Sequence, residues 1–267
     1  MHSSETYKEI NGFSMFYRDQ GRGVPVMLIH GFPLSGDIWD LQIETLSTKA
    51  RVIAPDLRGF GKSGITEGTY FMELFAHDLK ELLYTLGIEN AVFAGISMGG
   101  YIIFTFYRMF PSYVKAMILL GTRSGVDSEQ GKQGRINLAQ RARNGEMDKI
   151  ADEWTEKLFA PSTIKIRPDI VHTVRDGISR TSPGAIANAS LGMMERSDST
   201  SMLHNIDCPV LIIVGEKDIF TTVEEAKKMA AKIKGARVEV VKDAAHLTCL
   251  EAPEKVNSLM LSFLSKI

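Results

Sequence analysis

The chain has 267 residues, of which 44% are hydrophobic, so it is long enough for one large α/β domain or for a core with an inserted subdomain. Its 31 basic and 32 acidic residues give a formal net charge of -1, and no basic run is present, so neither nucleic acid nor an anionic membrane surface is an expected partner. Two cysteines, Cys208 and Cys249, are too few for a disulfide framework and are not spaced as metal ligands, which favours a reducing, cytoplasmic location.

The first elements expected along the chain form a hairpin. Residues Met1 to Glu5 lack the basic start and the apolar segment of a signal peptide, so export by that route is not expected. Asn11-Gly12 then separates two short runs with strand character, Tyr7 to Ile10 and Phe13 to Tyr17. This dipeptide is typical of a two-residue hairpin turn.

Four apolar runs follow, separated by helical patterns. The runs are Val26 to Ile29, Arg51 to Ala54, Ala91 to Ala94 and Val114 to Leu120, and the helices are expected over Ile38 to Leu46, Tyr70 to Leu86 and Gly99 to Met109. Continuous apolar runs indicate strands buried on both faces, so they predict a parallel sheet covered by helices. The uncharged stretch from Ala91 to Tyr107 is too short and too interrupted for a membrane span of about 20 residues.

The pattern changes after Gly121. Up to about Asn205 the sequence shows helical segments without a convincing strand, namely Gln133 to Asn144, Glu146 to Leu158, Pro168 to Ser179 and Pro183 to Met194. Strand character returns at Pro209 to Val214 and Arg237 to Val241, with a helix over Val223 to Ile233 and a last helix from Pro253 to about Leu264. We therefore expect a mostly parallel α/β core made of residues 1–121 and 206–267, with a helical cap inserted at 122–205.

A serine stands on a tight turn between the third apolar run and its helix, in Gly95-Ile96-Ser97-Met98-Gly99. This Gly-x-Ser-x-Gly pattern is the nucleophile elbow, in which the residues two before and two after the serine must be small for the chain to pass itself. Ser97 would lie at a helix N-terminus, where backbone N–H groups favour negative charge. A simple tight connection is the alternative interpretation of the same pentapeptide.

A serine hydroxyl needs a general base and a group that orients it. Of the three histidines after Ser97, His246 follows the last expected strand and so lies at the same sheet edge, whereas His172 and His204 lie in or near the helical insertion. Asp218 follows the preceding strand at that edge and is the expected acid. Helix capping by Asp218, and Glu216 as the carboxylate, remain alternatives.

Two backbone N–H groups are expected to bind the oxyanion that forms during acyl transfer. The first belongs to Met98, directly after the serine, and the second to Phe32, in the loop after the first apolar run. Pro33 has no N–H and cannot serve. His30 precedes this loop, and we interpret it as a structural residue that holds the turn by hydrogen bonds.

Five motifs in this order resemble those of the α/β-hydrolase family: His30-Gly31-Phe32-Pro33, the loop from Asp56 to Ser63, the elbow, Gly215-Glu216-Lys217-Asp218, and His246. The resemblance covers nearly the whole chain and implies that fold, with Ser97, Asp218 and His246 as the catalytic triad. Within the family the run from His30 to Trp39 looks closest to small carboxylesterases, to enol-lactone hydrolases similar to 3-oxoadipate enol-lactonase, and to cofactor-free perhydrolases. Neither a metal nor an organic cofactor is expected.

These motifs predict a serine hydrolase that cleaves a small or medium, largely apolar carboxylic ester through an acyl-enzyme. The alternatives are an enol-lactone hydrolase, a carbon-carbon bond hydrolase, a perhydrolase and a ligand receptor on the same scaffold. The substrate would be a small-molecule ester or lactone, and the oligomeric state is not indicated. Arg123 either anchors a substrate carboxylate or pairs with an acid of the cap. The side chains expected at the substrate, each of which core packing would also explain, are Phe32, Arg123, Trp154, Met193 and Leu247.

Overall fold

An eight-stranded sheet forms the centre of the protein. The computed structural model describes residues 5–267, so most of the segment on which the signal-peptide expectation rests lies outside it. The strand order is β1-β2-β4-β3-β5-β6-β7-β8. The strands are β1 (Glu5–Ile10), β2 (Phe13–Gly21), β3 (Pro25–Ile29), β4 (Arg51–Pro55), β5 (Ala91–Ile96), β6 (Val114–Leu120), β7 (Val210–Gly215) and β8 (Arg237–Val241). The pairs β1–β2 and β2–β4 are antiparallel and the other pairs are parallel, which confirms the predicted sheet with its N-terminal hairpin.

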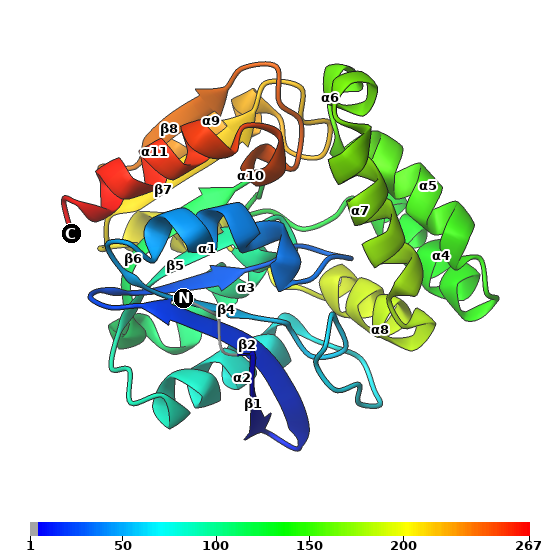
Figure 1. Cartoon of the computed structure of the whole chain (residues 1–267), viewed down its shortest axis with the longest axis horizontal. Coiled ribbons are helices and arrows are strands. Elements are labelled where there is room, and N and C mark those ends of the chain that lie inside the picture. The colour runs from blue at the N-terminus through cyan, green and yellow to red at the C-terminus, as the bar shows by residue number, and fades with distance from the viewer. Residues whose placement is uncertain (1–4) are drawn as a thin grey trace.

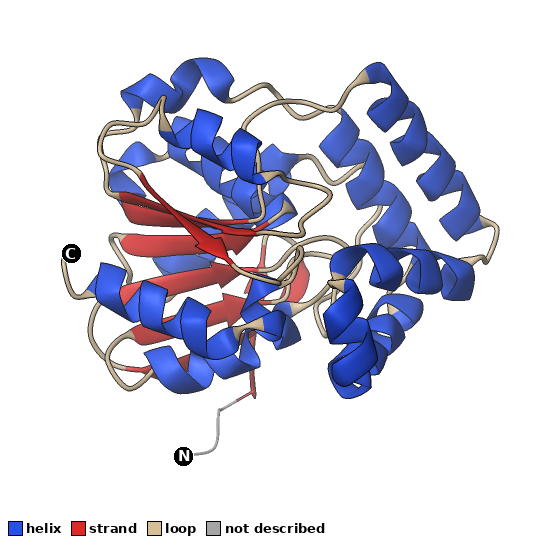
Figure 2. Ribbon diagram, turned by 90° about the horizontal axis from the view of Figure 1, so that it is seen from above, coloured by secondary structure: helices blue, strands red, loops and turns tan. Residues whose placement is uncertain are grey.

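Helices cover both faces of this sheet, as Figure 2 shows. Alternate residues of a strand belong to opposite faces, so Phe93 of β5 packs in one hydrophobic cluster while Val92 and Ala94 pack in the other. The first face carries α2 (Met72–Thr85), α3 (Met98–Met109) and α9 (Val223–Ala230), and the second carries η1 (Gly36–Trp39), α1 (Asp40–Leu46), α10 (Thr248–Glu251) and α11 (Pro253–Leu264). A short turn, η2 (Pro111–Tyr113), leads from α3 into β6. Each apolar run therefore contributes side chains to the hydrophobic layers on both faces of the sheet.

Between β6 and β7 the described chain contains helices and no strand. These are α4 (Glu129–Arg143), α5 (Met147–Leu158), α6 (Pro161–Ile166), α7 (Pro168–Arg180), α8 (Pro183–Met194) and the 3-10 helix η3 (Thr200–Asn205). α4 packs along α8 and α5 packs along α7. Figure 1 shows α4 to α8 beside the sheet, on the side opposite the C-terminus.

A few helix boundaries differ from the sequence predictions. α4 begins at Glu129 rather than Gln133, because the Ser128 side chain accepts a hydrogen bond from the Gly131 N–H and caps the helix earlier. Gly131 and Gly134 weaken the helical pattern there. α6 and α10 were not predicted, since a helix of one turn or little more leaves no periodic signal in the sequence. No helix within residues 5–267 is long and apolar enough to cross a membrane.

Candidate active site

Ser97 occupies a strained turn between β5 and α3. Its φ of 54° and ψ of -114° are unusual for a residue with a side chain. A Cβ on Gly95 would lie 2.7 Å from the carbonyl carbon of Gly99, and a Cβ on Gly99 would lie 2.4 Å from the Ile29 carbonyl oxygen. A hydrogen bond to the neighbouring strand β6 also holds the turn, because the Ser97 N–H donates to the Leu120 carbonyl over 2.9 Å. Glycine is therefore required at both positions, because any side chain there would collide with backbone atoms.

His246 and Asp218 form a buried pair at the same edge of the sheet. His246 Nδ1 lies 2.8 Å from Asp218 Oδ2, and the two side chains are 4% and 0% exposed. Asp218 Oδ1 accepts the N–H groups of Phe220 and Thr221 over 2.8 and 3.0 Å, which fixes the carboxylate. Because the Nδ1–H of His246 donates to this carboxylate, Nε2 is the ring nitrogen left to accept a proton.

The structure decides between the alternatives for the carboxylate that pairs with His246. Thr222, not Asp218, caps α9, in a capping box with Glu225. Glu216 is exposed, lies 3.3 Å from Lys217 and accepts the Asp243 N–H. The helix-cap alternative for Asp218 is therefore wrong, and His246 pairs with Asp218 rather than with Glu216.

A pocket of about 50 Å³ brings Ser97 and His246 together. Its other lining residues are Phe32, Tyr101, Arg123, Arg135, Trp154, Met193, Phe220 and Thr221. Leu247 does not line it. That side chain is fully buried in the hydrophobic cluster with α1 and α11, because the chain turns into α10 directly after His246. The expectation of a substrate contact at Leu247 is thus replaced by a packing role.

Two backbone N–H groups lie close to Ser97, that of Met98, the next residue in the chain, and that of Phe32, in the loop after β3. Met98 is the first residue of α3, so its N–H has no acceptor within the helix. The N–H of Phe32 also has no hydrogen-bond partner within residues 5–267. A Cβ on Gly31 would lie 3.2 Å from the Ser97 Cβ, so the loop that carries Phe32 passes directly beside the serine. Neither N–H group has a hydrogen-bond partner in the part of the chain that the structure describes.

Aromatic rings form one wall of the pocket. Phe220 stacks on Trp154 with ring centroids 5.7 Å apart and lies 4.9 Å from the His246 ring, and Phe32 meets Trp154 edge-on at 5.3 Å. Phe220 was not predicted as a pocket residue, although it follows Asp218 by only two positions. Tyr101 of α3, Arg135 of α4 and Thr221, in the loop that carries Asp218, were also missed.

The loop that carries His246 is held by the helical segment 122–205. The Leu158 carbonyl, at the end of α5, accepts the N–H groups of both His246 and Leu247 over 3.1 and 3.3 Å. The Glu251 carboxylate accepts hydrogen bonds from Ala245 N–H, Ala160 N–H and the Thr163 hydroxyl, at 2.7 to 2.8 Å. Glu251 thus joins the histidine loop to Ala160 and to the first turn of α6.

Arg123 pairs with an acid of the helical segment, which was one of the two expectations for it. Its Nη2 donates to Asp127 Oδ1 over 2.6 Å, and its Nη1 donates to the Phe220 carbonyl over 3.3 Å. It also lines the pocket, so pairing with Asp127 leaves it beside Ser97.

His30 is a structural residue, as expected from its position before the loop. Its Nε2 accepts the Leu57 N–H over 3.0 Å, and its Nδ1 lies 2.9 Å from the Gly31 carbonyl. Complete burial lowers the pKa of His30 to about 4. The neutral ring therefore joins the loop after β3 to the loop after β4.

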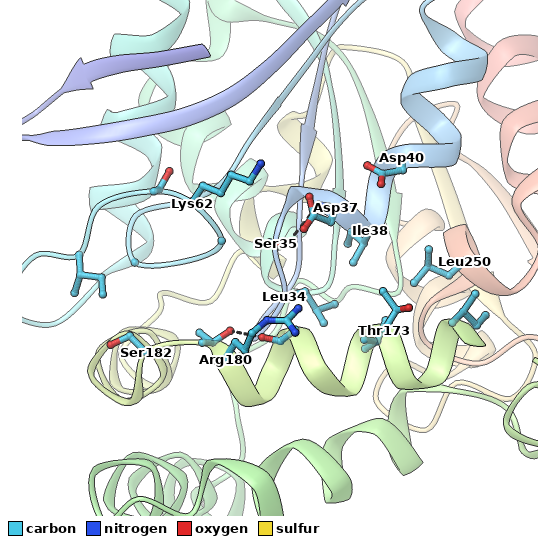
Figure 3. A pocket seen from close by; sticks show the side chains of 18 residues that line it. Leu34, Ser35, Asp37, Ile38, Asp40, Lys62, Thr173, Arg180, Ser182 and Leu250 are labelled. Atoms are coloured by element: carbon cyan, nitrogen blue, oxygen red, sulfur yellow. Dashed lines mark hydrogen bonds between the residues drawn. The ribbon is translucent and has the colours of Figure 1, made fainter. Parts of the chain in front are cut away.

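A second cavity, of about 570 Å³, lies between α7 and the loops after β3 and β4. Figure 3 shows Leu34, Ile38 and Leu250 on one side of it and Thr173 and Arg180 of α7 on the other. It shares no lining residue with the pocket at Ser97. Residues 5–267 contain no group of three or more His, Cys, Asp or Glu side chains placed to hold a metal ion.

Comparison with known proteins gives consistent matches. The profile of a family described as alpha/beta hydrolase fold matches residues 24–253. A putative non-heme chloroperoxidase of Synechocystis is 29% identical, with 94% of each chain covered. A structure of a thermophilic esterase from Thermogutta terrifontis with malate bound is 38% identical, with a TM-score of 0.94 and coverage of 98% of this chain and 97% of that one. The enol-lactonase from Burkholderia xenovorans is 26% identical, with a TM-score of 0.91 and coverage of 97% and 100%.

Proposed function

We propose that this chain, which belongs to the α/β-hydrolase family, is a serine hydrolase that cleaves small or medium carboxylic esters through an acyl-enzyme. The observation that carries the proposal is the buried pair of Asp218 and His246, which shares a small pocket with a serine on a strained turn. Similarity over almost the whole chain to a protein described as an esterase supports the same reaction.

In this mechanism Ser97 attacks the ester carbonyl while Nε2 of His246 accepts the hydroxyl proton. Asp218 holds the Nδ1–H and stabilises the imidazolium that forms. The N–H groups of Met98 and Phe32 bind the oxyanion of the tetrahedral intermediate. His246 then gives the proton to the leaving alcohol, and afterwards activates the water that hydrolyses the acyl-enzyme.

The size and walls of the pocket support a short acyl group. A space of about 50 Å³ accommodates a few groups of the size of water, roughly three or four, and far less than a drug-sized ligand. The apolar wall comes from Phe32, Trp154, Met193 and Phe220. Residues 122–205 act as the cap over a core of residues 1–121 and 206–267, so a longer acyl chain requires the cap to move.

An enol-lactone is the second candidate substrate. A lactone is an internal ester, so the same serine, histidine and oxyanion donors would open it without any change in mechanism. The similarity to a structure described as an enol-lactonase favours this candidate, with 26% identity over nearly the full length of both chains. The two candidates differ in the substrate bound and not in the catalytic residues.

A substrate panel tests the proposal. The native protein and the variants Ser97→Ala and His246→Ala are assayed with p-nitrophenyl esters from acetate to decanoate and with an enol-lactone. Both variants are expected to lose at least about 1,000-fold in kcat on every substrate that the native protein cleaves. The exposed residues Ser262 and His204 provide matched controls as Ser262→Ala and His204→Ala, which retain native rates. Full activity of Ser97→Ala would rule out the serine mechanism.

A further inference from the structure

Three arginines surround one buried carboxylate beside the pocket. Asp127, which is 5% exposed, lies 2.6 Å from Arg123 Nη2, 3.1 Å from Arg135 Nε and 2.9 Å from Arg196 Nη1. Burial raises the pKa of Asp127, but the hydrogen bond and the charges of the arginines hold it well below its usual range. Asp127 is therefore ionised, and these four residues, the Asp127 cluster, carry a net charge of +2.

The arginines differ in how far their donors are used. Arg196 donates to Asp127 and to the carbonyls of Met193 and Gly125, and its guanidinium lies 4.2 Å from the centre of the Tyr101 ring. Arg135 uses only Nε, so its two Nη groups have no partner within residues 5–267. Arg123 keeps its buried Nε without a partner in the same range. Among the described residues, Arg123 and Arg135 thus keep N–H donors without an acceptor, whereas Arg196 uses both of its Nη groups.

These free donors belong to residues that line the pocket with Ser97 and His246. Arg123, Arg135 and Tyr101 all line it, and the Tyr101 hydroxyl also has no hydrogen-bond partner within residues 5–267. The other acid that acts on Arg123 is Glu225, whose carboxylate is used at the start of α9 by Thr222. Beside apolar walls water screens this positive charge only weakly, so the charge attracts an anion more strongly than it would at the open surface.

We infer that the ester cleaved at Ser97 carries a carboxylate, which binds between Arg135, Arg123 and the Tyr101 hydroxyl. A guanidinium presents two parallel N–H donors that match the two oxygens of a carboxylate, so Arg135 can bind it through the Nη groups that the fold leaves free. Given the small pocket, the substrate is a half-ester of a short dicarboxylic acid or a short ester of a small hydroxy acid. This inference rests on the proposed ester hydrolysis.

Paired substrates test the inference. The acyl side is tested with monoethyl succinate against the neutral ethyl pentanoate, and the alcohol side with O-acetylglycolate against propyl acetate. Acid release at constant pH gives kcat/KM for each. We expect the native enzyme to prefer the anionic member of at least one pair by about tenfold or more, and the pair that shows this tells on which side of the ester the carboxylate lies. Preference for the neutral member in both pairs would overturn the inference.

Variants of Arg135 locate the effect. Arg135→Met is expected to reduce the ratio of kcat/KM between anionic and neutral esters by at least tenfold, and Arg135→Lys, which keeps the charge, restores part of it. Arg143→Met removes an exposed arginine from the same helix and leaves the ratio as in the native enzyme. An unchanged ratio in a folded Arg135→Met, checked by its circular dichroism, would contradict the inference.

A binding measurement separates this inference from the proposed reaction. Succinate is titrated calorimetrically into Ser97→Ala and into Ser97→Ala with Arg135→Met, neither of which needs to turn over. Binding to the first, weakened at least tenfold in the second, supports the carboxylate site even if Ser97 proves not to be the nucleophile. Equal affinity in both, or no binding at millimolar succinate to either, would overturn the site while leaving ester hydrolysis to its own test.

Discussion

Replacing Glu251 by alanine is expected to weaken both the fold and catalysis, because this side chain ties the histidine loop to residues 160–163. Its carboxylate accepts three hydrogen bonds, from Ala245 N–H, Ala160 N–H and the Thr163 hydroxyl. Glu251→Ala leaves these donors without an acceptor in a half-buried site. At about 1 kcal/mol for each donor, the free energy of unfolding falls by about 2–3 kcal/mol. For a chain of this size that lowers Tm by about 4–12 °C.

The effect of Glu251 on catalysis follows from its position. Ala245 immediately precedes His246, and a displacement of a catalytic group by about 1 Å can cost about 100-fold. We expect kcat for p-nitrophenyl acetate to fall by about 10- to 100-fold, with a smaller change in KM, because Glu251 does not line the pocket. Glu251→Gln keeps one of the two acceptor oxygens and should lie between alanine and the native protein.

The exposed Glu254, at the start of α11, provides the control. Glu254→Ala loses only a favourable charge at a helix N-terminus, worth about 0.3–1 kcal/mol. Thermal unfolding and steady-state kinetics are measured for the native protein and the three variants. If Glu251→Ala behaves like Glu254→Ala in both Tm and kcat, the role given to the Glu251 hydrogen bonds is wrong.

Three further predictions follow from particular contacts. Gly99→Ala places a Cβ 2.4 Å from the Ile29 carbonyl oxygen, so it should abolish activity and lower the free energy of unfolding by about 1–3 kcal/mol. Gly134→Ala is the control, because nothing lies within 4 Å of its Cβ, and it should not destabilise the protein. Urea unfolding and ester assays compare the two variants. The pKa of His30 is about 4 in the fold and 6.5 otherwise, so the unfolded chain binds the extra proton and stability is lost as pH falls from 6.5 towards 4. His30→Gln should remove that part of the pH dependence of unfolding, and identical slopes would refute the assignment. Finally, kcat/KM for p-nitrophenyl esters should fall from acetate to decanoate because the pocket at Ser97 measures only about 50 Å³, and a flat or rising profile would contradict the preference for a short acyl group.

The sequence predicted those parts of the fold that depend on short-range patterns. Apolar runs such as Val114 to Leu120 coincide with strands because a strand covered on both faces is apolar at every position. The glycines of the elbow were informative for a similar local reason, since Gly95 and Gly99 contact backbone atoms of neighbouring elements. Because Ser97, Asp218 and His246 each follow a parallel strand, the sequence also predicted that they lie at one edge of the sheet.

The missed residues depend on packing between distant segments. Arg135 reaches the pocket because α4 packs along α8, and nothing in the sequence near Arg135 indicates that contact. Glu251 has the sequence pattern of a surface acid, but it accepts hydrogen bonds from Ala160 and Thr163, which lie 91 and 88 positions earlier in the chain. Leu247 was misplaced for the opposite reason, because nearness to His246 in sequence suggested the pocket while the start of α10 directs its side chain into the core.

The central claim, that Ser97 forms the acyl-enzyme, is tested most directly by locating the acyl group. The protein is mixed with p-nitrophenyl acetate, quenched in acid within the first turnover, digested and analysed by mass spectrometry. We predict one added acetyl group on the peptide that contains Ser97, and none on that peptide in Ser97→Ala. An acetyl group that turns over on another residue, with the Ser97 peptide unmodified throughout, would contradict the mechanism.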